Sequence, residues 1–149
     1  MKFEIERKFL VNHHSWEQLE KPSGDYLRQG YILNDPNKTV RVRLTGSDAF
    51  LTIKGISTGF SRPEFEYSIP QADAEQLLDN FCDSELSKTR YKIDHEGKIW
   101  EVDVFHGHNT GLILAEIELD HEDESFEIPH WVAEEVTGDV KYYNSNLSK

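Results

Sequence analysis

The chain has 149 residues, 37% of them hydrophobic and 30% charged, and is long enough to bury the core of a single domain over residues 1–149. No apolar run approaches the ~18 residues of a membrane-spanning helix, and the single Cys82 excludes an intrachain disulfide. The net charge is −12, and the sequence shows no basic nucleic-acid-binding patch. Because charges also interrupt the N-terminal stretch where a signal peptide is apolar, we expect a cytoplasmic protein without nucleic-acid or membrane partners; a homodimer stays open.

Short segments of alternating apolar and polar residues, separated by turn residues, recur along most of the chain. Residues two apart in a β-strand share a face, so this alternation predicts antiparallel strands. The predicted strands cover residues 3–9, 26–33, 39–45, 50–55, 62–69, 86–93, 98–105 and 112–120. Eight such strands in a small domain favour a barrel or a sandwich.

Helical spacing appears between and after these strands. Apolar residues that follow Pro70 at helical spacing predict a helix over residues 71–82. A weaker pattern predicts a helix over 12–20. A proline two residues ahead of 131–136 favours a third helix there, and residues 142–147 are expected to form a short docked turn.

One row of each of seven strands is made almost entirely of charged residues. The carboxylates of these rows are Glu4, Glu6, Glu64, Glu66, Glu101, Asp103, Glu116 and Glu118. The cations are Lys8, Arg41, Arg43, Lys54, Arg62, Lys88 and Arg90. The opposite rows are apolar.

Two arrangements fit these rows. One is a sheet or sandwich whose charged faces lie in water, where cross-strand ion pairs are common and weak. The other is a closed barrel with a charged lumen and an apolar outer wall covered by helices and loops. The scarcity of uncharged polar residues in the rows, and their high arginine content, favour the charged lumen.

A lumen of this kind suits metal-assisted phosphoryl transfer. Arginine and lysine bind phosphate oxygens, whereas clustered carboxylates repel phosphate unless a divalent cation lies between them. Oxygen ligands favour Mg²⁺ or Mn²⁺. The sequence contains no Walker-A motif or glycine-rich nucleotide loop, so side chains would hold the phosphates.

The order of these residues resembles the CYTH superfamily, the triphosphate tunnel metalloenzymes. The motifs that carry the resemblance are Glu4-x-Glu6-x-Lys8, Arg41-x-Arg43, Lys54, Arg62-x-Glu64-x-Glu66, Lys88-x-Arg90, Glu101-x-Asp103, Glu116-x-Glu118 and Lys141-Tyr142-x-Asn144. The resemblance covers nearly the whole chain and implies a mainly β fold, an eight-stranded antiparallel tunnel with a polar lumen and a few flanking helices. The chain looks most like the small bacterial members that cleave inorganic tripolyphosphate to pyrophosphate and phosphate.

The resemblance also implies a role for each group of tunnel residues. Mg²⁺ or Mn²⁺ would be bound by Glu4, Glu6, Glu116 and Glu118. The phosphates would be bound by Lys8, Arg41, Arg43, Lys54, Arg62 and Arg90, with Glu64, Glu66, Glu101 and Asp103 as supporting tunnel carboxylates. Lys88, assisted by Tyr31, would activate the attacking water, and neighbouring cations would lower the pKa of Lys88 toward the range that this role needs.

Other functions stay open from the sequence. A class IV-type adenylate cyclase, or a thiamine or nucleoside triphosphatase, would use the same fold on another triphosphate. A non-catalytic polyphosphate-binding module would need the cations but would gain nothing from eight lumen carboxylates. Arg7 has no assigned role, because it lies on the same outward-facing row of the strand as Ile5.

Overall fold

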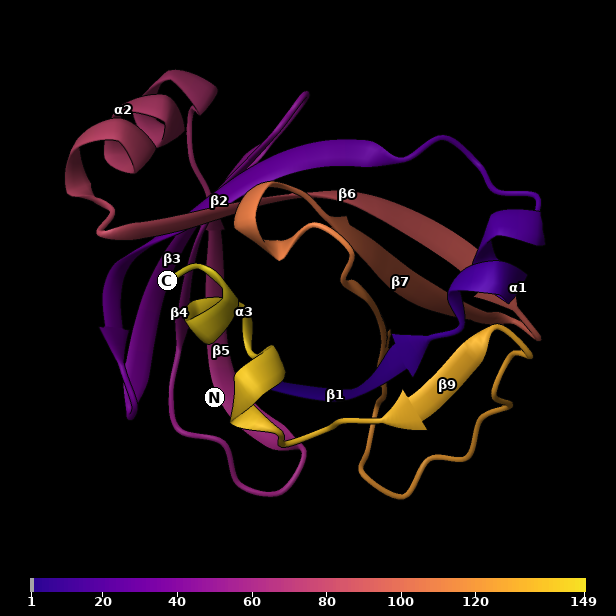
Figure 1. Ribbon diagram of the computed structural model, residues 1–149. Helices are drawn as coiled ribbons and strands as arrows, with labels where there is room; N and C mark the ends of the chain where they lie inside the picture. The colour runs from indigo at the N-terminus through magenta and orange to yellow at the C-terminus, as the bar shows by residue number, and fades with distance from the viewer. Residues whose placement is uncertain (1) are drawn as a thin grey trace.

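The computed structural model describes residues 2–149 and contains an antiparallel β-barrel (Figure 1). The barrel strands are β1 (Phe3–Val11), β2 (Asp25–Asp35), β3 (Lys38–Thr45), β4 (Ala49–Lys54), β5 (Ser61–Ser68), β6 (Ser84–His95), β7 (Lys98–Phe105) and β8 (Ile113–Glu118). They are hydrogen-bonded in the order β5-β4-β3-β2-β6-β7-β8-β1, and β1 also pairs with β5, so the ring closes. The predicted closed eight-stranded barrel is confirmed, and the strand ends differ from the predicted ranges by at most two residues.

Short helices connect and cover the strands. They are α1 (His13–Gln18), α2 (Gln71–Phe81), the 3₁₀ turns η1 (Gly107–Asn109) and η2 (Val140–Tyr142), and α3 (Asn144–Leu147). The helices predicted over 12–20 and 71–82 are confirmed, and the predicted docked turn over 142–147 contains α3. No helix within residues 2–149 is long and apolar enough to cross a membrane.

The prediction of a helix over 131–136 is wrong, because this segment forms strand β9 (Val132–Glu135), outside the barrel. β5 pairs with β1 only along Phe3–Ile5 and leaves the rest of that edge of β1 uncovered. β9 pairs with the same edge further along, at Phe9 and Val11, and so satisfies backbone groups there. The uncovered edge of β1 is distant in sequence from residues 131–136, so local spacing does not reveal that a strand forms there.

The apolar outer rows of the strands pack against α1, α2 and the segment that leads into β9. Trp131 lies edge-on against Trp16 of α1 and Trp100 of β7, with ring centroids 5.6 and 6.0 Å apart. On another side, Leu78 of α2 belongs to a buried cluster with Val42 of β3. Because these clusters bury the outward rows, the alternate rows of the same strands face the lumen.

The predicted covering of the outer wall is incomplete on β4 and β5. Ile53, Phe65 and Tyr67 are 38%, 40% and 55% exposed on the outward rows of these two strands. α2 follows β5 in the sequence but packs against β2, β3 and β4, so it leaves the outer side of β5 open.

The lumen is not charged along its whole length. At one end Leu86, Phe105 and Leu114, on the lumen rows of β6, β7 and β8, form an apolar cluster against which Tyr142 and Leu147 pack. We call residues 139–149 the tail; it closes this end of the barrel, and Figure 1 shows its α3 helix in yellow within the outline of the strands. The charged rows line most of the remaining lumen, together with uncharged residues of β2, β3 and β4.

Candidate active site

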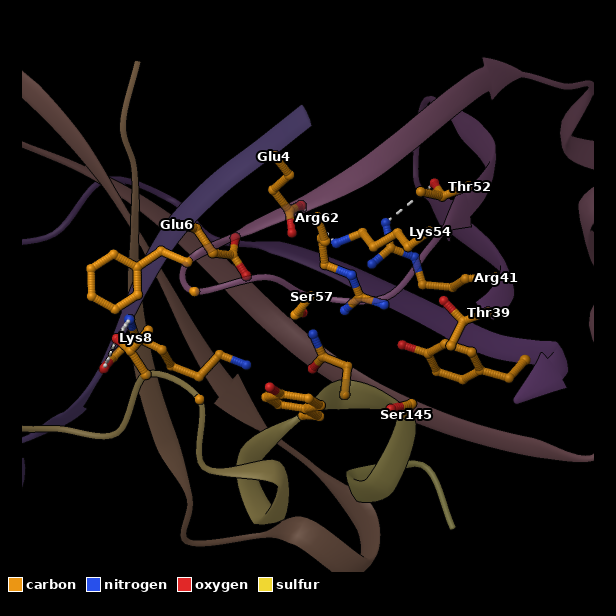
Figure 2. Close-up of a pocket in the computed structure, with 17 residues that line it drawn as sticks. Glu4, Glu6, Lys8, Thr39, Arg41, Thr52, Lys54, Ser57, Arg62 and Ser145 are labelled. Carbon is orange, nitrogen blue, oxygen red and sulfur yellow. Dashed lines mark hydrogen bonds and ion pairs between the residues drawn. The ribbon is translucent and has the colours of Figure 1, made fainter. Parts of the chain in front are cut away.

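A pocket opens into the lumen between β1, β3, β4, β5 and the tail, and we call it the glutamate pocket. Figure 2 shows the side chains of Lys8, Arg41 and Arg62 pointing into one space beside Glu4 and Glu6. The charged residues that line it are Glu4, Glu6, Lys8, Arg41, Lys54 and Arg62. The structure therefore brings two of the predicted metal ligands together with four of the predicted phosphate-binding residues.

Strand register places opposite charges next to each other in this wall. Glu4 on β1 lies opposite Arg62 on β5, and Lys8 on β1 lies opposite Glu116 on β8. The Lys8 Nζ atom is 3.7 Å from Glu116 Oε1. Cross-strand pairs of opposite charge stabilise a sheet modestly.

Lys54 holds two carboxylates of the pocket wall. Its Nζ atom is 2.6 Å from Glu4 Oε2 and 3.6 Å from Glu64 Oε2. Burial alone would raise the pKa of Glu4, but the charges of Lys54 and Arg41 contribute to lowering it to about 2. Burial and a hydrogen bond with Glu4 raise the pKa of Glu64 to about 7. Glu4 therefore stays ionised at neutral pH, whereas Glu64 takes up a proton more readily than a free glutamate does.

Carboxylates crowd around Glu6. Burial raises the pKa of Glu6 well above its usual value, and the negative charges of Glu116 and Glu4 raise it further. Glu118 lies opposite Glu6 at an exposed rim, where partial burial and the charges of Glu4 and Glu101 raise its pKa. A divalent cation would relieve this repulsion, and carboxylate oxygens are the ligands that Mg²⁺ and Mn²⁺ prefer, so the donor set fits the implied metal.

Lys88 is fully buried at the side of the pocket, behind Asn144 of the tail. Its Nζ atom is 2.6 Å from Asp103 Oδ2 and 3.3 Å from Asn144 Oδ1. Burial lowers the pKa of Lys88 to about 8, with the charge of Arg90 acting in the same direction and that of Asp103 against it. The expected effect of a neighbouring cation is present, but burial is the larger cause. Tyr31 lines the glutamate pocket directly.

A second pocket lies at the other end of the lumen, between β2, β3, β6 and β7. We call it the arginine pocket; its charged residues are Asp25, Arg43, Asp48, Arg90, Lys92 and Glu101. Arg90 binds both oxygens of Asp103, with Nε–Oδ1 and Nη2–Oδ2 distances of 2.8 and 2.9 Å. Glu66 lies between the pockets, with Oε2 3.8 Å from a terminal nitrogen of both Arg41 and Arg43. Two of the predicted phosphate-binding residues, Arg43 and Arg90, are thus separated from the other four.

The tail forms one wall of the glutamate pocket. The Lys8 Nζ atom donates a hydrogen bond to the carbonyl oxygen of Tyr142 at 2.9 Å. The side-chain amide of Asn34 donates to the carbonyl oxygen of Ser145 at 2.7 Å. The tail is therefore bonded to β1 and β2, and it accepts a hydrogen bond from Lys8, which lines the pocket.

Arg7 lies outside the lumen and ties two segments together at the mouth of the pocket. It binds both carboxylate oxygens of Glu135 at 2.8 and 2.6 Å, and its guanidinium lies 5.1 and 5.2 Å from the ring centroids of Phe60 and Phe126. Thr137 donates a hydrogen bond to Glu135 at 2.6 Å, and both Thr137 and Phe60 line the glutamate pocket. Arg7 thus positions the β4–β5 loop and the segment that leads into the tail.

The sequence prediction placed Tyr31 in the site and Thr52 on a lumen row, but it missed most of the other uncharged residues of the pocket. Thr39 lies on the lumen row of β3, so strand alternation alone could have placed it. Ser57 and Phe60 come from the β4–β5 loop and Tyr143 from the tail. No alternating pattern exists in those segments, and no local signal marks them as pocket residues.

A CYTH domain model matches residues 2–148 of the chain. The chain therefore belongs to the CYTH family, the triphosphate tunnel metalloenzymes, in agreement with its barrel and charged lumen. It is 49% identical over 147 residues to an inorganic triphosphatase from Acetivibrio thermocellus, with 98% of this chain and 93% of the relative covered. It is also 39% identical over 151 residues to an inorganic triphosphatase from Nitrosomonas europaea, with 97% and 96% covered.

Solved structures share the fold. The crystal structure of the inorganic triphosphatase NE1496 superimposes with a TM-score of 0.67 at 35% identity and covers 99% of this chain and 95% of its own. The crystal structure of a putative adenylate cyclase from Bacillus halodurans superimposes with a TM-score of 0.64 at 19% identity, over 82% of this chain and 84% of its own. The second match supports the barrel fold only.

Proposed function

We propose that this protein hydrolyses inorganic tripolyphosphate to pyrophosphate and phosphate inside the barrel, with Mg²⁺ or Mn²⁺ as cofactor. The observation that carries this proposal is the glutamate pocket, in which four cations surround two carboxylates within one space. A polyanion needs the cations, and a metal-assisted reaction explains the carboxylates beside them. Two relatives that are named inorganic triphosphatases support the same substrate.

The cations of the glutamate pocket bind the phosphate chain in this proposal. The Nε atoms of Arg41 and Arg62 are buried and have no hydrogen-bond partner among residues 2–149. Guanidinium groups bind phosphoryl oxygens through paired N–H donors, so a bound chain would give these atoms partners. Arg43 and Arg90 would act from the arginine pocket, Arg90 mainly by holding Asp103.

Glu4, Glu6 and Glu116 would hold the metal, with Glu118 at the rim of the same cluster. A bound divalent metal neutralises phosphate charge and polarises the phosphoryl oxygen. The negative charge that raises the pKa of Glu6 supports this placement.

Lys88 acts as the general base in this proposal, with Tyr31 beside the phosphate chain. A base must be neutral before it accepts a proton, and the pKa of about 8 leaves a part of Lys88 neutral near pH 7. Lys88 now donates a hydrogen bond to Asn144, so the Asn144 side chain must turn away before Lys88 faces the pocket.

The test is a steady-state assay of phosphate release from tripolyphosphate, ATP, thiamine triphosphate and long-chain polyphosphate, each with Mg²⁺ and with Mn²⁺. We expect the highest kcat/KM for tripolyphosphate and no turnover in a chelator. A higher kcat/KM for any other substrate would remove tripolyphosphate from the proposal. Formation of cyclic AMP from ATP would assign a cyclase instead, and tight binding without turnover would assign a binding module.

A further inference from the structure

Gln29 is an uncharged residue in the charged lumen, and none of the roles above is assigned to it. It lies on the lumen row of β2 between Leu27 and Tyr31, opposite Arg43 of β3 and Leu86 of β6. Leu27 lines the arginine pocket and Tyr31 lines the glutamate pocket. Gln29 therefore belongs to the wall between the two pockets, midway along the lumen.

The side chain of Gln29 is 0% exposed, and neither its Nε2 nor its Oε1 atom has a hydrogen-bond partner within residues 2–149. A primary amide offers two donors and an acceptor with two lone pairs, and leaving all of them unpaired in a buried site is unfavourable. Leucine or methionine would fill the same space without this penalty. An unpaired buried amide on the lumen wall between two pockets indicates a partner that arrives with the ligand.

The unpaired buried groups gather on the lumen wall. Five such side-chain atoms occur in the described part of the chain, and four of them belong to lumen residues: two in Gln29 and one each in Arg41 and Arg62. The fifth is Trp100 Nε1, in the apolar core outside the barrel. The three unpaired lumen donors suit the oxygens of a phosphate chain, whereas Gln29 Oε1 is an acceptor and would be repelled by those oxygens.

We propose that Gln29 contacts the reacting groups directly, with Nε2 donating to a phosphoryl oxygen and Oε1 accepting a hydrogen bond from the attacking water. This inference rests on the proposed triphosphatase activity. Water is the partner that matches both atoms, because it can donate to Oε1 while its oxygen faces phosphorus. A glutamine orients the attacking water in the same way in some GTP-hydrolysing enzymes.

The neighbours of Gln29 fit this role. Lys88 lies on the adjacent strand one step along the same lumen face, opposite Leu27. Such diagonal neighbours are roughly 7–8 Å apart at their Cα atoms, within reach of long side chains. The water oxygen bonds to the terminal phosphorus, the bond from phosphorus to the bridging oxygen breaks, and pyrophosphate leaves with the electron pair. The proton that the water loses passes to neutral Lys88.

The test replaces Gln29 with methionine, which has a similar length but cannot donate a hydrogen bond. For Gln29→Met we expect an equal or higher melting temperature than wild type, because two unpaired groups are removed from the interior. We expect kcat for tripolyphosphate to fall about 100-fold, as when one transition-state donor is removed, with a much smaller change in KM. The control Trp100→Phe removes the unpaired N–H outside the lumen and should keep kcat within about twofold.

A measurement on the wild-type protein does not depend on how the variants fold. In metal-free buffer, where we expect no turnover, titration with tripolyphosphate should shift the ¹⁵N–¹H resonances of the Gln29 side-chain amide. Full activity in Gln29→Met, or an unchanged Gln29 amide signal while Arg41 and Arg62 side-chain signals shift, would overturn the proposal. If wild type neither binds nor hydrolyses tripolyphosphate, the proposed function itself fails, and that result is distinct from either of these.

Discussion

The glutamate pocket and the arginine pocket draw on the same charged rows, but their cations have different partners. In the glutamate pocket Arg62 leaves its buried Nε without a partner among residues 2–149, and Lys8 is 3.7 Å from its carboxylate. In the arginine pocket Arg90 forms two short bonds to buried Asp103, which also pairs with Lys88. A loosely paired cation can turn to an incoming phosphate, whereas moving Arg90 would leave a buried carboxylate short of partners. Arg62 and Lys8 thus suit binding and Arg90 suits support. Within the same pockets Lys54 is paired with Glu4 at 2.6 Å, and Arg43 lies 3.8 Å from Glu66.

The largest effect is expected at Lys88, which joins the two pockets. Lys88→Met removes the proposed base and should lower kcat about 1000-fold, since general base catalysis contributes on that scale. Phosphate release under saturating tripolyphosphate measures it. Lys98→Met, at the first residue of β7, is the control and should keep wild-type kcat. Equal activity in both variants would show that Lys88 is not the base.

The pH dependence of kcat tests the same residue in the wild-type protein. Burial lowers the pKa of Lys88 to about 8, and the base is active when neutral, so kcat should rise with pH through about 8 and then level. Asp103, Arg90 and Asn144 face its ammonium group. A kcat that stays flat between about pH 7 and 9 would contradict the assignment.

Substitution of a carboxylate in the glutamate pocket should have the next largest effect on kcat. Glu6→Gln removes one charge from the proposed metal site and should lower kcat by at least about 100-fold. Loss of a residue that only contacts a metal ligand already costs up to about 100-fold, and Glu6 is proposed to bind the metal directly. It should also raise the metal concentration needed for half-maximal activity. Glu134→Gln on exposed β9 is the matched control. Normal metal titration in Glu6→Gln would place the metal elsewhere.

Arg62 and Arg90 allow a direct comparison of the two pockets. Arg62→Met should raise KM for tripolyphosphate about 10- to 100-fold, the scale of a charged hydrogen bond, and leave the melting temperature near that of wild type. Arg90→Met should instead lower the free energy of unfolding by about 3 kcal/mol, because it removes a partner of buried Asp103. Urea unfolding and KM measured for both variants separate the two effects. If Arg90→Met changed only KM, the proposed division between the pockets would be wrong.

The smallest effect is expected outside the lumen. Arg7→Met removes the ion pair with Glu135 and the ring contacts, and should lower the free energy of unfolding by about 1 kcal/mol. A double-mutant cycle with Glu135→Gln should give a positive coupling energy. Additive effects of the two substitutions would show that this pair does not stabilise the protein.

The barrel and its charged rows could be predicted because alternation is a local signal that repeats on each strand. Glu4, Glu6 and Lys8 share a face whatever the rest of the chain does. The same signal also reaches Thr39, but an uncharged residue does not stand out in a sequence. Sequence order could not tell which cations share a pocket, since that depends on which strands are neighbours around the ring.

Other features depend on contacts between distant parts of the chain. Local spacing predicts a helix for the segment that forms β9. This segment is a strand because it pairs with the uncovered edge of β1, which is distant in the sequence. Lys88 is buried behind Asn144, which lies 56 positions further along the chain. The unpaired amide of Gln29 is visible only when all of its neighbours are placed.

One edge of β1 is shared by β5 and β9, and this sharing affects when the barrel can close during folding. β1 leaves the ribosome first, yet its partners are β5, β8 and β9, and the last of these ends at Glu135. Contacts of such high sequence separation form late and slow folding. One edge of β1 therefore stays partly unpaired until β9 has been synthesised, so a delay between β8 and β9 favours aggregation through that edge.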